Sequence, residues 1–239
     1  MRIKAIKTRI FRENEDLLHF IFKYVKKIPE NSVLVITSKI LALSEGRTLK
    51  IKGEKEKIKV IKRESDFALK TKYVWLTIKD GMAMASSGID ESNADGKIIL
   101  LPGDSFKSAS LVRGALRKKF KIRNLGVLIT DSRLFPLRAG IVGVALGYAG
   151  FAGIKSYIGE KDIFGRKLKM SKTDIADSLA TSAVLCMGEG KEKQPLALII
   201  SAPVKFVEKV NKKELYIDPR EDLYQPLFEK IRKIKFKSR

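Results

Sequence analysis

The chain has 239 residues, a length that buries a sizeable core in one large domain or in two intimately packed lobes. Its 49 Lys and Arg residues against 27 Asp and Glu residues give a net charge of +22, which attracts polyanions such as nucleotides, polyglutamyl cofactors or nucleic acids. One histidine and one cysteine exclude a multi-histidine zinc site, a cysteine-based zinc cluster and an internal disulfide.

Hydrophobic periodicity predicts an alternating α/β chain. Helices are expected over residues 16–27, over residues 173–187, and from a cap at Asp104 to about residue 120. Strands are expected over residues 1–7, 33–37, 73–78, 97–101 and 126–129.

Glycine recurs every three or four residues between Gly140 and Gly153. The spacing matches neither G-x-G-x-x-G nor G-x-x-x-x-G-K-[ST], so neither a Rossmann nor a P-loop fold is expected. These glycines indicate close backbone packing in the core or at a subunit interface, and a loop that approaches phosphate is the alternative.

Localisation is suggested by the N-terminus and by the apolar segments. Residues 1–7 alternate charged and apolar side chains like a strand and lack the apolar run of a signal peptide. The longest apolar stretch, residues 140–154, is too short to span a bilayer. Cys186 falls on the apolar side of its expected helix, which predicts a buried thiol and a reducing cytoplasm as the location.

Carboxylates occur in three short polar segments that follow predicted strands or a helix. Asp90 lies in the turn Ser-Gly-Ile-Asp-Glu-Ser-Asn of residues 87–93, Asp131 ends an apolar strand, and Glu189 follows a helix. Carboxylate oxygens are ligands that Mg²⁺ and Mn²⁺ prefer, so the three acids form a candidate set for two-metal phosphoryl transfer. An Asx-turn or a helix cap is the alternative interpretation of each segment.

Seven segments occur in an order that is typical of one protein family. They are residues 33–39 (Val-Leu-Val-Ile-Thr-Ser-Lys), 44–47 (Ser-Glu-Gly-Arg), 87–93, 100–102, 130–132 (Thr-Asp-Ser), 162–166 and 187–189 (Met-Gly-Glu). The order resembles that of the coenzyme F-420:gamma-glutamyl ligase family, from about residue 6 to about residue 203. The resemblance implies a mixed-sheet α/β ligase fold and a GTP-dependent ligase that adds L-glutamate to a carboxylate acceptor.

The resemblance also implies roles for individual residues. Asp90 and Asp131 would hold one Mg²⁺ or Mn²⁺ ion, and Ser132 with Glu189 would serve a second. Residues that would contact the nucleotide are Arg9, Ile10, Phe11, Ser38, Lys39, Asn93, Met187, Gly188, Glu189, Gly190 and Gln194.

Amide formation in water places its own requirements on the site. A carboxylate must be made electrophilic before an amine attacks it in water, and transfer of a nucleotide's terminal phosphate produces such an acyl phosphate. Cationic side chains must offset the repulsion between the anionic substrates, and Arg138, Arg166 and Lys39 are candidates. Of these, Arg138 and Arg166 are the expected catalytic residues. An ordinary surface cation is the alternative for each of the three, Arg166 included.

The chain departs from the family pattern at two places. Leu43 stands where the family has a lysine, and residues 134–140 (Leu-Phe-Pro-Leu-Arg-Ala-Gly) keep only Arg138 and Gly140 of Gly-Arg-x-Trp-Arg-x-Gly. Arg133 is a candidate to replace the missing arginine. These changes resemble those of the folate-metabolism gamma-glutamate ligase subgroup of the family, so a folate-type acceptor is expected in preference to a coenzyme F-420 precursor.

We expect one ligase domain of residues 1–222 with a basic helical extension of residues 223–239. The resemblance implies a homodimer, and no contact with membranes is expected. Nucleic-acid binding through the positive charge and a catalytically altered nucleotide-binding or metal-binding homologue are the alternative functions.

Overall fold

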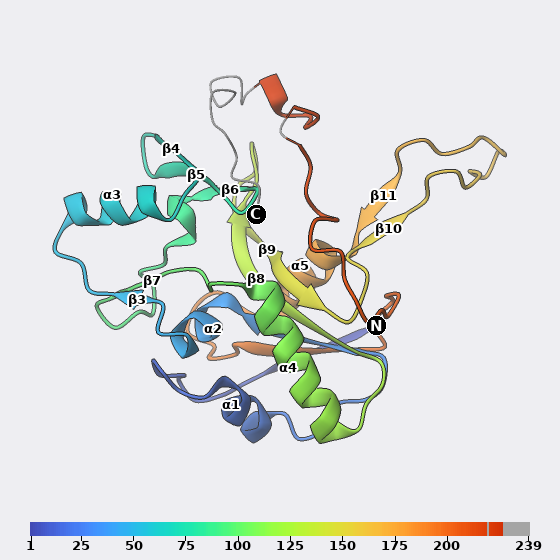
Figure 1. The fold of residues 1–239 in the computed structure, drawn as a ribbon, viewed down its shortest axis with the longest axis horizontal. Coiled ribbons are helices and arrows are strands. Elements are labelled where there is room, and N and C mark those ends of the chain that lie inside the picture. Colours follow the sequence, from blue (N-terminus) through green and yellow to red (C-terminus); the bar gives the residue numbers. More distant parts are fainter. Residues whose placement is uncertain (219, 227–239) are drawn as a thin grey trace.

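The computed structural model describes residues 1–218 and 220–226 (Figure 1). Its helices are α1 (Leu17–Tyr24), α2 (Ser38–Ser44), α3 (Glu54–Arg63), α4 (Ser105–Phe120), α5 (Ile175–Met187) and the 3-10 turn η1 (Ser86–Gly88). Its strands are β1 (Arg2–Ile6), β2 (Ser32–Thr37), β3 (Thr48–Leu49), β4 (Phe67–Lys70), β5 (Trp75–Lys79), β6 (Met82–Ala85), β7 (Ile98–Ile99), β8 (Leu125–Leu134), β9 (Ile141–Ala149), β10 (Ile154–Ser156), β11 (Lys172–Asp174) and β12 (Leu196–Ile200).

A five-stranded mixed sheet in the order β1-β12-β2-β8-β9 forms the centre of the molecule. Strands β2 and β8 run parallel, whereas the other neighbouring pairs of this sheet are antiparallel. Residues 33–36 of β2 and 125–129 of β8 are continuous apolar runs, because both faces of the sheet are covered there. Thr37 pairs with Thr130, so the carboxyl end of β2 lies beside the middle of β8.

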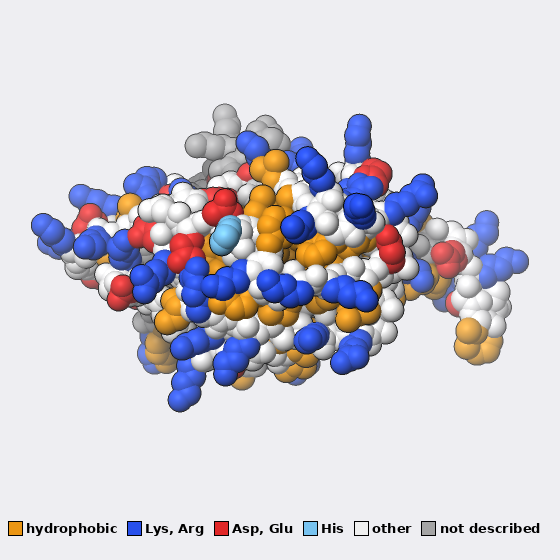
Figure 2. All heavy atoms as spheres, turned by 90° about the horizontal axis from the view of Figure 1, so that it is seen from below, with side chains coloured by type: hydrophobic (Ala, Val, Ile, Leu, Met, Phe, Trp, Pro, Cys, Tyr) orange, Lys and Arg blue, Asp and Glu red, His pale blue; other side chains and the backbone are white. Residues whose placement is uncertain are grey.

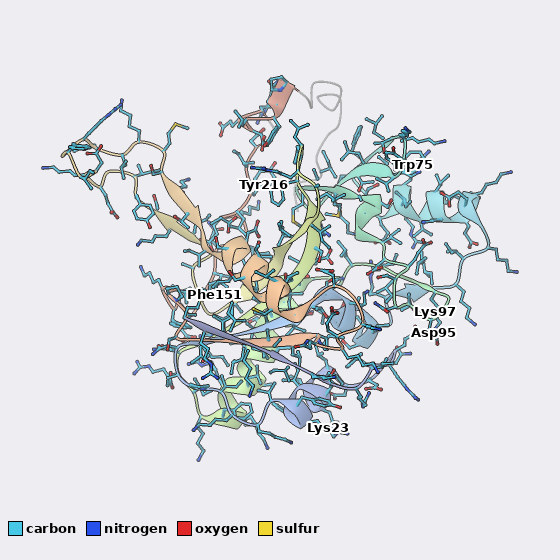
Figure 3. All side chains as sticks on the ribbon, turned by 180° about the vertical axis from the view of Figure 1, so that it is seen from behind. Lys23, Trp75, Asp95, Lys97, Phe151 and Tyr216 are labelled. Atoms are coloured by element: carbon cyan, nitrogen blue, oxygen red, sulfur yellow. The ribbon has the colours of Figure 1, made fainter. Side chains whose placement is uncertain are left out.

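Helices cover both faces of the central sheet (Figures 1 and 3). On one face, Phe20 of α1 and Leu116 of α4 belong to the same buried cluster as Ile129 of β8. On the other face, Ala180 of α5 belongs to the same buried cluster as Leu128 of β8. The core therefore lies in two layers, one on each side of the sheet.

The chain between α2 and α4 forms a second, smaller lobe (Figure 1). It contains the antiparallel sheet β4-β5-β6, the helix α3 and the short pair β3-β7. Strand β6 contacts β8 of the central sheet, so the lobe packs directly against the larger one. Strands β10 and β11 form a third feature, an arm whose connecting loop projects away from the body of the molecule.

The expected mixed α/β fold is confirmed, as are most of the elements. Asp104 accepts a hydrogen bond from Lys107 N, and α4 ends at Phe120 as predicted. The two other helices are shorter than expected, since α1 ends at Tyr24, and Asp174 caps α5 so that the helix begins at Ile175. Residues 227–239, on which most of the expected C-terminal helix falls, lie outside the described residues.

Strand β8 is longer than the sequence predicted. The apolar run ends at Ile129, but pairing with β9 continues to Leu134 beyond a bulge between Ile129 and Thr130. Asp131 therefore lies inside a strand, and the prediction that it ends one is wrong. Hairpin pairing through polar residues explains the difference, because the apolar pattern records burial and not backbone pairing.

The glycine pattern reflects close packing in the core, as predicted. A Cβ on Gly143 would lie 2.5 Å from the Ala180 carbonyl oxygen of α5, and one on Gly147 would lie 2.6 Å from Phe106 N. Cys186, in contrast, is exposed, because the last turn of α5 buries Val184 and Met187 instead. The prediction of a buried thiol is wrong. Within the described residues, no helix is long and apolar enough to cross a membrane.

Candidate active site

Ser38 and Asp131 meet where β2 passes into α2. Ser38 is the first residue of α2, and its Oγ donates a hydrogen bond of 3.0 Å to Asp131 Oδ1. The parallel pairing of Thr37 with Thr130 brings the two residues together. The adjacent register shift, where Leu146 of β9 is the extra residue, is the kind of irregularity that re-aims side chains. The structure thus joins a predicted nucleotide contact to a predicted metal ligand.

Arg133 lies on the same face of β8 as Asp131. Its Nη1 donates to Asp131 Oδ2 and, at 3.0 Å, to the Ser132 carbonyl oxygen. The residue is only 8% exposed. Asp131 is therefore held by a hydroxyl on one oxygen and by a guanidinium on the other.

Asp90 is held beside the same helix by Lys39. Lys39 Nζ lies 2.7 Å from Asp90 Oδ2 and also donates to the Ser92 carbonyl oxygen at 3.0 Å. Ser92 N donates to Asp90 Oδ1, so the Asx-turn interpretation of this segment is correct as well. Burial acts to raise the pKa of Asp90, but the hydrogen bonds from Lys39 and Ser92 outweigh it and lower that pKa. Asn93 follows with a φ of +52°, which places the turn in the left-handed region.

Glu189 approaches β8 from the other face of the sheet. Helix α5 ends at Met187, Gly188 turns the chain with a φ of +79°, and Ser132 Oγ donates to Glu189 Oε1 at 2.5 Å. Successive side chains of a strand point to opposite faces, so this pair lies on the α5 side while Asp131 faces α2. The loop that continues through Gly190 and Gln194 is fixed at its end, where Thr37 N donates to the Pro195 carbonyl oxygen.

The N-terminal stretch lies alongside this loop, because Thr8 N donates to the Lys193 carbonyl oxygen. Arg9 makes two hydrogen bonds to Glu15 and lies over the ring of Phe20. Ile10 is exposed, whereas the Phe11 side chain is buried in the core against Phe20. Only the backbone of Phe11 is therefore available to a bound nucleotide.

The two arginines that sequence reasoning assigned to catalysis lie on exposed hairpins. Arg138 lies in the turn between β8 and β9, where its N donates to the Phe135 carbonyl oxygen. Arg166 lies in the loop of the β10-β11 arm, where its N donates to Asp162 Oδ1. That arm projects away from the body of the molecule in Figure 1, so this chain does not bring Arg166 to Asp131.

The donor chemistry fits divalent ions, since carboxylate and hydroxyl oxygens are ligands that Mg²⁺ and Mn²⁺ prefer. In the part of the chain that the structure describes, no three His, Cys, Asp or Glu side chains are grouped closely enough to hold one ion. Lys39 and Arg133 occupy the positions on Asp90 and Asp131 that an added cation would take. The acids thus lie in two places. Asp90 and Asp131 lie around α2, and Glu189 lies beside Ser132 on the opposite face of the sheet.

The Ser-Glu-Gly-Arg motif of residues 44–47 links the two lobes. Glu45 accepts hydrogen bonds from Gly103 N at 2.8 Å and from Ser108 Oγ at 3.0 Å, which fixes the start of α4. Arg47 donates to the Leu101 carbonyl oxygen and to Glu64, which also pairs with Lys79. Sequence reasoning missed the role of Glu64, because an acid that directly follows a lysine-rich helix gives no signal of its partners.

This mixed α/β fold gathers acids, hydroxyls and cations where the carboxyl end of β2 meets the middle of β8. Such an arrangement is suited to an enzyme that handles anionic substrates. The chain belongs to the F420-0:gamma-glutamyl ligase family, whose sequence model matches residues 5–200. It is therefore a ligase of the γ-glutamyl type, and the resemblance inferred from the motifs is confirmed.

Curated relatives are similar over most of their length. The chain is 33% identical to a coenzyme F420:L-glutamate ligase of Methanococcus maripaludis strain C6, with 94% of this chain and 97% of the relative covered. It is 32% identical to proteins of the same name from Methanocaldococcus jannaschii, over 86% of this chain and 90% of the relative, and from Methanopyrus kandleri, over 80% and 82%.

Proposed function

We propose that this chain is a GTP-dependent ligase that joins the amine of L-glutamate to a carboxylate acceptor through an acyl phosphate. The observation that carries the proposal is the meeting of Ser38 with Asp131 and of Lys39 with Asp90 at the start of α2. The family of the chain supports the γ-glutamyl product. The resemblance to the family supports GTP as the nucleotide, and the need to make the acceptor carboxylate electrophilic supports the acyl phosphate.

The reaction has two balanced steps. An acceptor carboxylate oxygen bonds to the γ-phosphorus of GTP, the bond from that phosphorus to the bridging oxygen breaks, and GDP leaves. The amine of glutamate then attacks the acyl carbon, phosphate leaves with the electron pair of the broken carbon–oxygen bond, and the amine loses a proton. Both substrates are anions, so each step needs positive charge nearby.

Three segments of the chain support a nucleotide site around α2. Lys39 holds the turn at Ser92, which places Asn93 near the helix. The loop of residues 187–194 ends beside Thr37, and the N-terminal stretch at Arg9 lies alongside that loop. Lys39 is the cation that would face the phosphates, because its ammonium group already lies among oxygen atoms.

Two Mg²⁺ or Mn²⁺ ions are part of the proposal. Asp90 and Asp131 would hold one ion, and Ser132 with Glu189 would hold the other. When bound, such ions neutralise phosphate charge. An ion that binds Asp90 and Asp131 would share these carboxylates with Lys39 and Arg133, which contact them in the chain alone.

The acceptor is proposed to be a folate-type molecule. The hairpin beyond Asp131 presents Leu134, Phe135 and Leu137 as exposed apolar side chains. These side chains offer no charge to the anionic phosphodiester tail of a coenzyme F-420 precursor. The printed names of the relatives make a coenzyme F420 precursor the second candidate. A competition between the two acceptors decides between them.

A homodimer is also proposed. The β10-β11 arm carries Ile163 and Phe164 with 92% and 88% of their surface exposed, and these apolar side chains suit burial against a second copy. Arg166 lies in the same loop, so its proposed contact with substrate requires a site completed by another subunit. Arg138 would act from its own hairpin.

Isotope transfer tests the acyl phosphate. The acceptor carboxylate is labelled with oxygen-18 and incubated with the protein, GTP, Mn²⁺ and L-glutamate. We expect one labelled oxygen in the phosphate that is released, because the acyl-phosphate bridge contains an acceptor oxygen. Unlabelled phosphate beside a glutamylated product would contradict the intermediate and leave the ligase activity standing.

A further inference from the structure

Arg133 carries a buried charge that the chain satisfies only in part. Its Nη1 is bonded to Asp131 and to the Ser132 carbonyl oxygen. Its Nε and Nη2 are buried and have no hydrogen-bond partner among residues 1–218 and 220–226. More than nine-tenths of the side chain is removed from solvent, so water does not compensate for the missing partners.

The two unpaired nitrogens lie on one edge of the guanidinium plane. That edge, made of the Nε and Nη2 hydrogens, matches the two oxygens of a carboxylate or the paired oxygens of a phosphate. A buried charge with unpaired donors costs stability, so a fold that needed Arg133 only as a partner for Asp131 would gain by closing this edge. Two free donors on one edge of the guanidinium group therefore indicate that a ligand binds there.

The position of the edge links it to the active site. Arg133 pairs with Val142 and Asp131 pairs with Val144 across β8 and β9, so both side chains point to the α2 face. Ser38 contacts the other oxygen of Asp131, and the next residue, Leu134, is exposed. Arg133 thus lies at the border between the buried core and the hairpin where substrate would enter.

Other charged groups do not satisfy this edge. Asp177 of α5 is close enough for the charge of Arg133 to oppose the effect of burial, which raises the pKa of Asp177. The Oδ1 of Asp177 already accepts a hydrogen bond from Ala145 N at 2.8 Å. Its carboxylate therefore interacts with the charge of Arg133 but accepts no hydrogen bond from Nε or Nη2.

We propose that the Nε–Nη2 edge of Arg133 binds a pair of anionic oxygens of a substrate beside Asp131. The ligand is a carboxylate, from glutamate or the acceptor, or a phosphate group, from the nucleotide. This inference rests on the proposed function for its substrates, but anion binding is measurable without turnover. It makes Arg133 a binding residue that also positions Asp131.

Calorimetric titration of the full chain tests the proposal with three separate probes: GDP with Mn²⁺, L-glutamate, and inorganic phosphate. The informative variant is Arg133→Lys, which keeps the charge beside Asp131 and removes the two-donor edge. We expect binding of at least one probe to weaken about tenfold or more, the loss of a charge-assisted pair of hydrogen bonds. If Arg133→Lys binds only glutamate more weakly, the edge is a carboxylate site. If it binds GDP and inorganic phosphate more weakly, the edge is a phosphate site.

Arg123→Gln is the matched control, since Arg123 is an exposed arginine in the turn before β8. Its binding of all probes should equal that of the wild type. Arg133→Ala supplies a second readout, because millimolar guanidinium should restore binding at a vacated arginine position and would not repair a general loss of folding.

Binding of all three probes by Arg133→Lys with wild-type affinity would overturn the inference, as would a wild-type protein that binds none of them. Failure of the proposed function is a different result, namely a protein that binds these anions and forms no glutamylated product. Thermal unfolding of each variant shows that its fold is intact during the titrations.

Discussion

Ser38 Oγ donates a 3.0 Å hydrogen bond to Asp131 Oδ1, although 93 residues separate the two positions in the chain. The contact depends on the parallel pairing of β2 and β8, which aligns Thr37 with Thr130. The same helix start presents Lys39 to Asp90. One turn of α2 therefore joins two acids that come from different lobes.

Replacement of Asp131 by asparagine should abolish the dependence of nucleotide binding on metal. The change removes one anionic ligand oxygen, which should weaken the Mn²⁺-dependent part of GDP binding by roughly 100-fold. Calorimetry with GDP, with and without Mn²⁺, measures it. Asp95→Asn, at an exposed position, is the control. Equal metal dependence in Asp131→Asn and the wild type would remove Asp131 from the site.

Gly143→Ala should destabilise the protein by about 1–3 kcal/mol, because the added methyl group would lie 2.5 Å from the Ala180 carbonyl oxygen. Gly114→Ala in α4 is the matched control, since a Cβ there meets nothing within 4 Å. It should be neutral or stabilising by up to about 1 kcal/mol. Urea unfolding compares the two. Equal effects of both substitutions would show that β9 does not pack against α5 as described.

Asp174→Asn should stabilise the protein more at pH 7 than at pH 4. Burial, with the nearby Asp177 adding to it, raises the pKa of Asp174 to about 6 in the folded state, above its ordinary value of 3.8. The folded state therefore holds a proton more tightly than the unfolded state, and this stabilisation, complete below pH 3.8, is lost as the pH rises through 6.

Asparagine removes this titration and keeps the cap on α5, because its side-chain oxygen also accepts a backbone hydrogen bond. The midpoint of thermal unfolding, measured for both proteins at pH 4 and pH 7, gives the comparison. A larger gain at pH 4 would contradict the raised pKa.

Nucleic-acid binding should be weak and unselective. Figure 2 shows Lys and Arg side chains scattered over one face of the molecule, with uncharged and apolar surface between them. Such a surface attracts polyanions at low salt and releases them as salt rises. Fluorescence anisotropy with unrelated duplexes and single strands checks this, and a tight, structure-selective complex at physiological salt would favour the nucleic-acid alternative.

The folate-type acceptor should outcompete the coenzyme F420 precursor. Leu134 and Phe135 replace the Gly-Arg of the family pattern, so fewer cations face an anionic tail at this hairpin. Equal concentrations of both acceptors in one reaction, with products separated by mass, give the preference. A glutamylated product from the coenzyme F420 precursor alone would contradict this prediction and leave the ligase assignment intact.

The sequence predicted the features that depend on local pattern. Asp104 as a cap, the apolar run of β2 and the packing role of Gly143 follow from capping, periodicity and side-chain size. Motif order also singled out Asp131 and Ser38, which the structure joins. Capping, periodicity and side-chain size are read within a few residues, whereas motif order was read along most of the chain.

Features that depend on tertiary contacts were not predictable in the same way. The extension of β8 past Asp131 depends on pairing with β9, and the exposure of Cys186 depends on which residues of the last α5 turn meet the sheet. The unpaired edge of Arg133 depends on the burial of a side chain of which only Nη1 is hydrogen-bonded. No local pattern encodes such an arrangement.

Product mass is the most direct test of the central claim. The purified protein is incubated with GTP, Mn²⁺, L-glutamate and each acceptor, and the acceptor is then analysed by mass spectrometry. We expect the acceptor to gain the mass of one or more glutamate residues, only when nucleotide is present and with release of GDP. An acceptor of unchanged mass in every complete reaction, from a folded protein, would contradict the assignment of this chain as a nucleotide-dependent γ-glutamyl ligase.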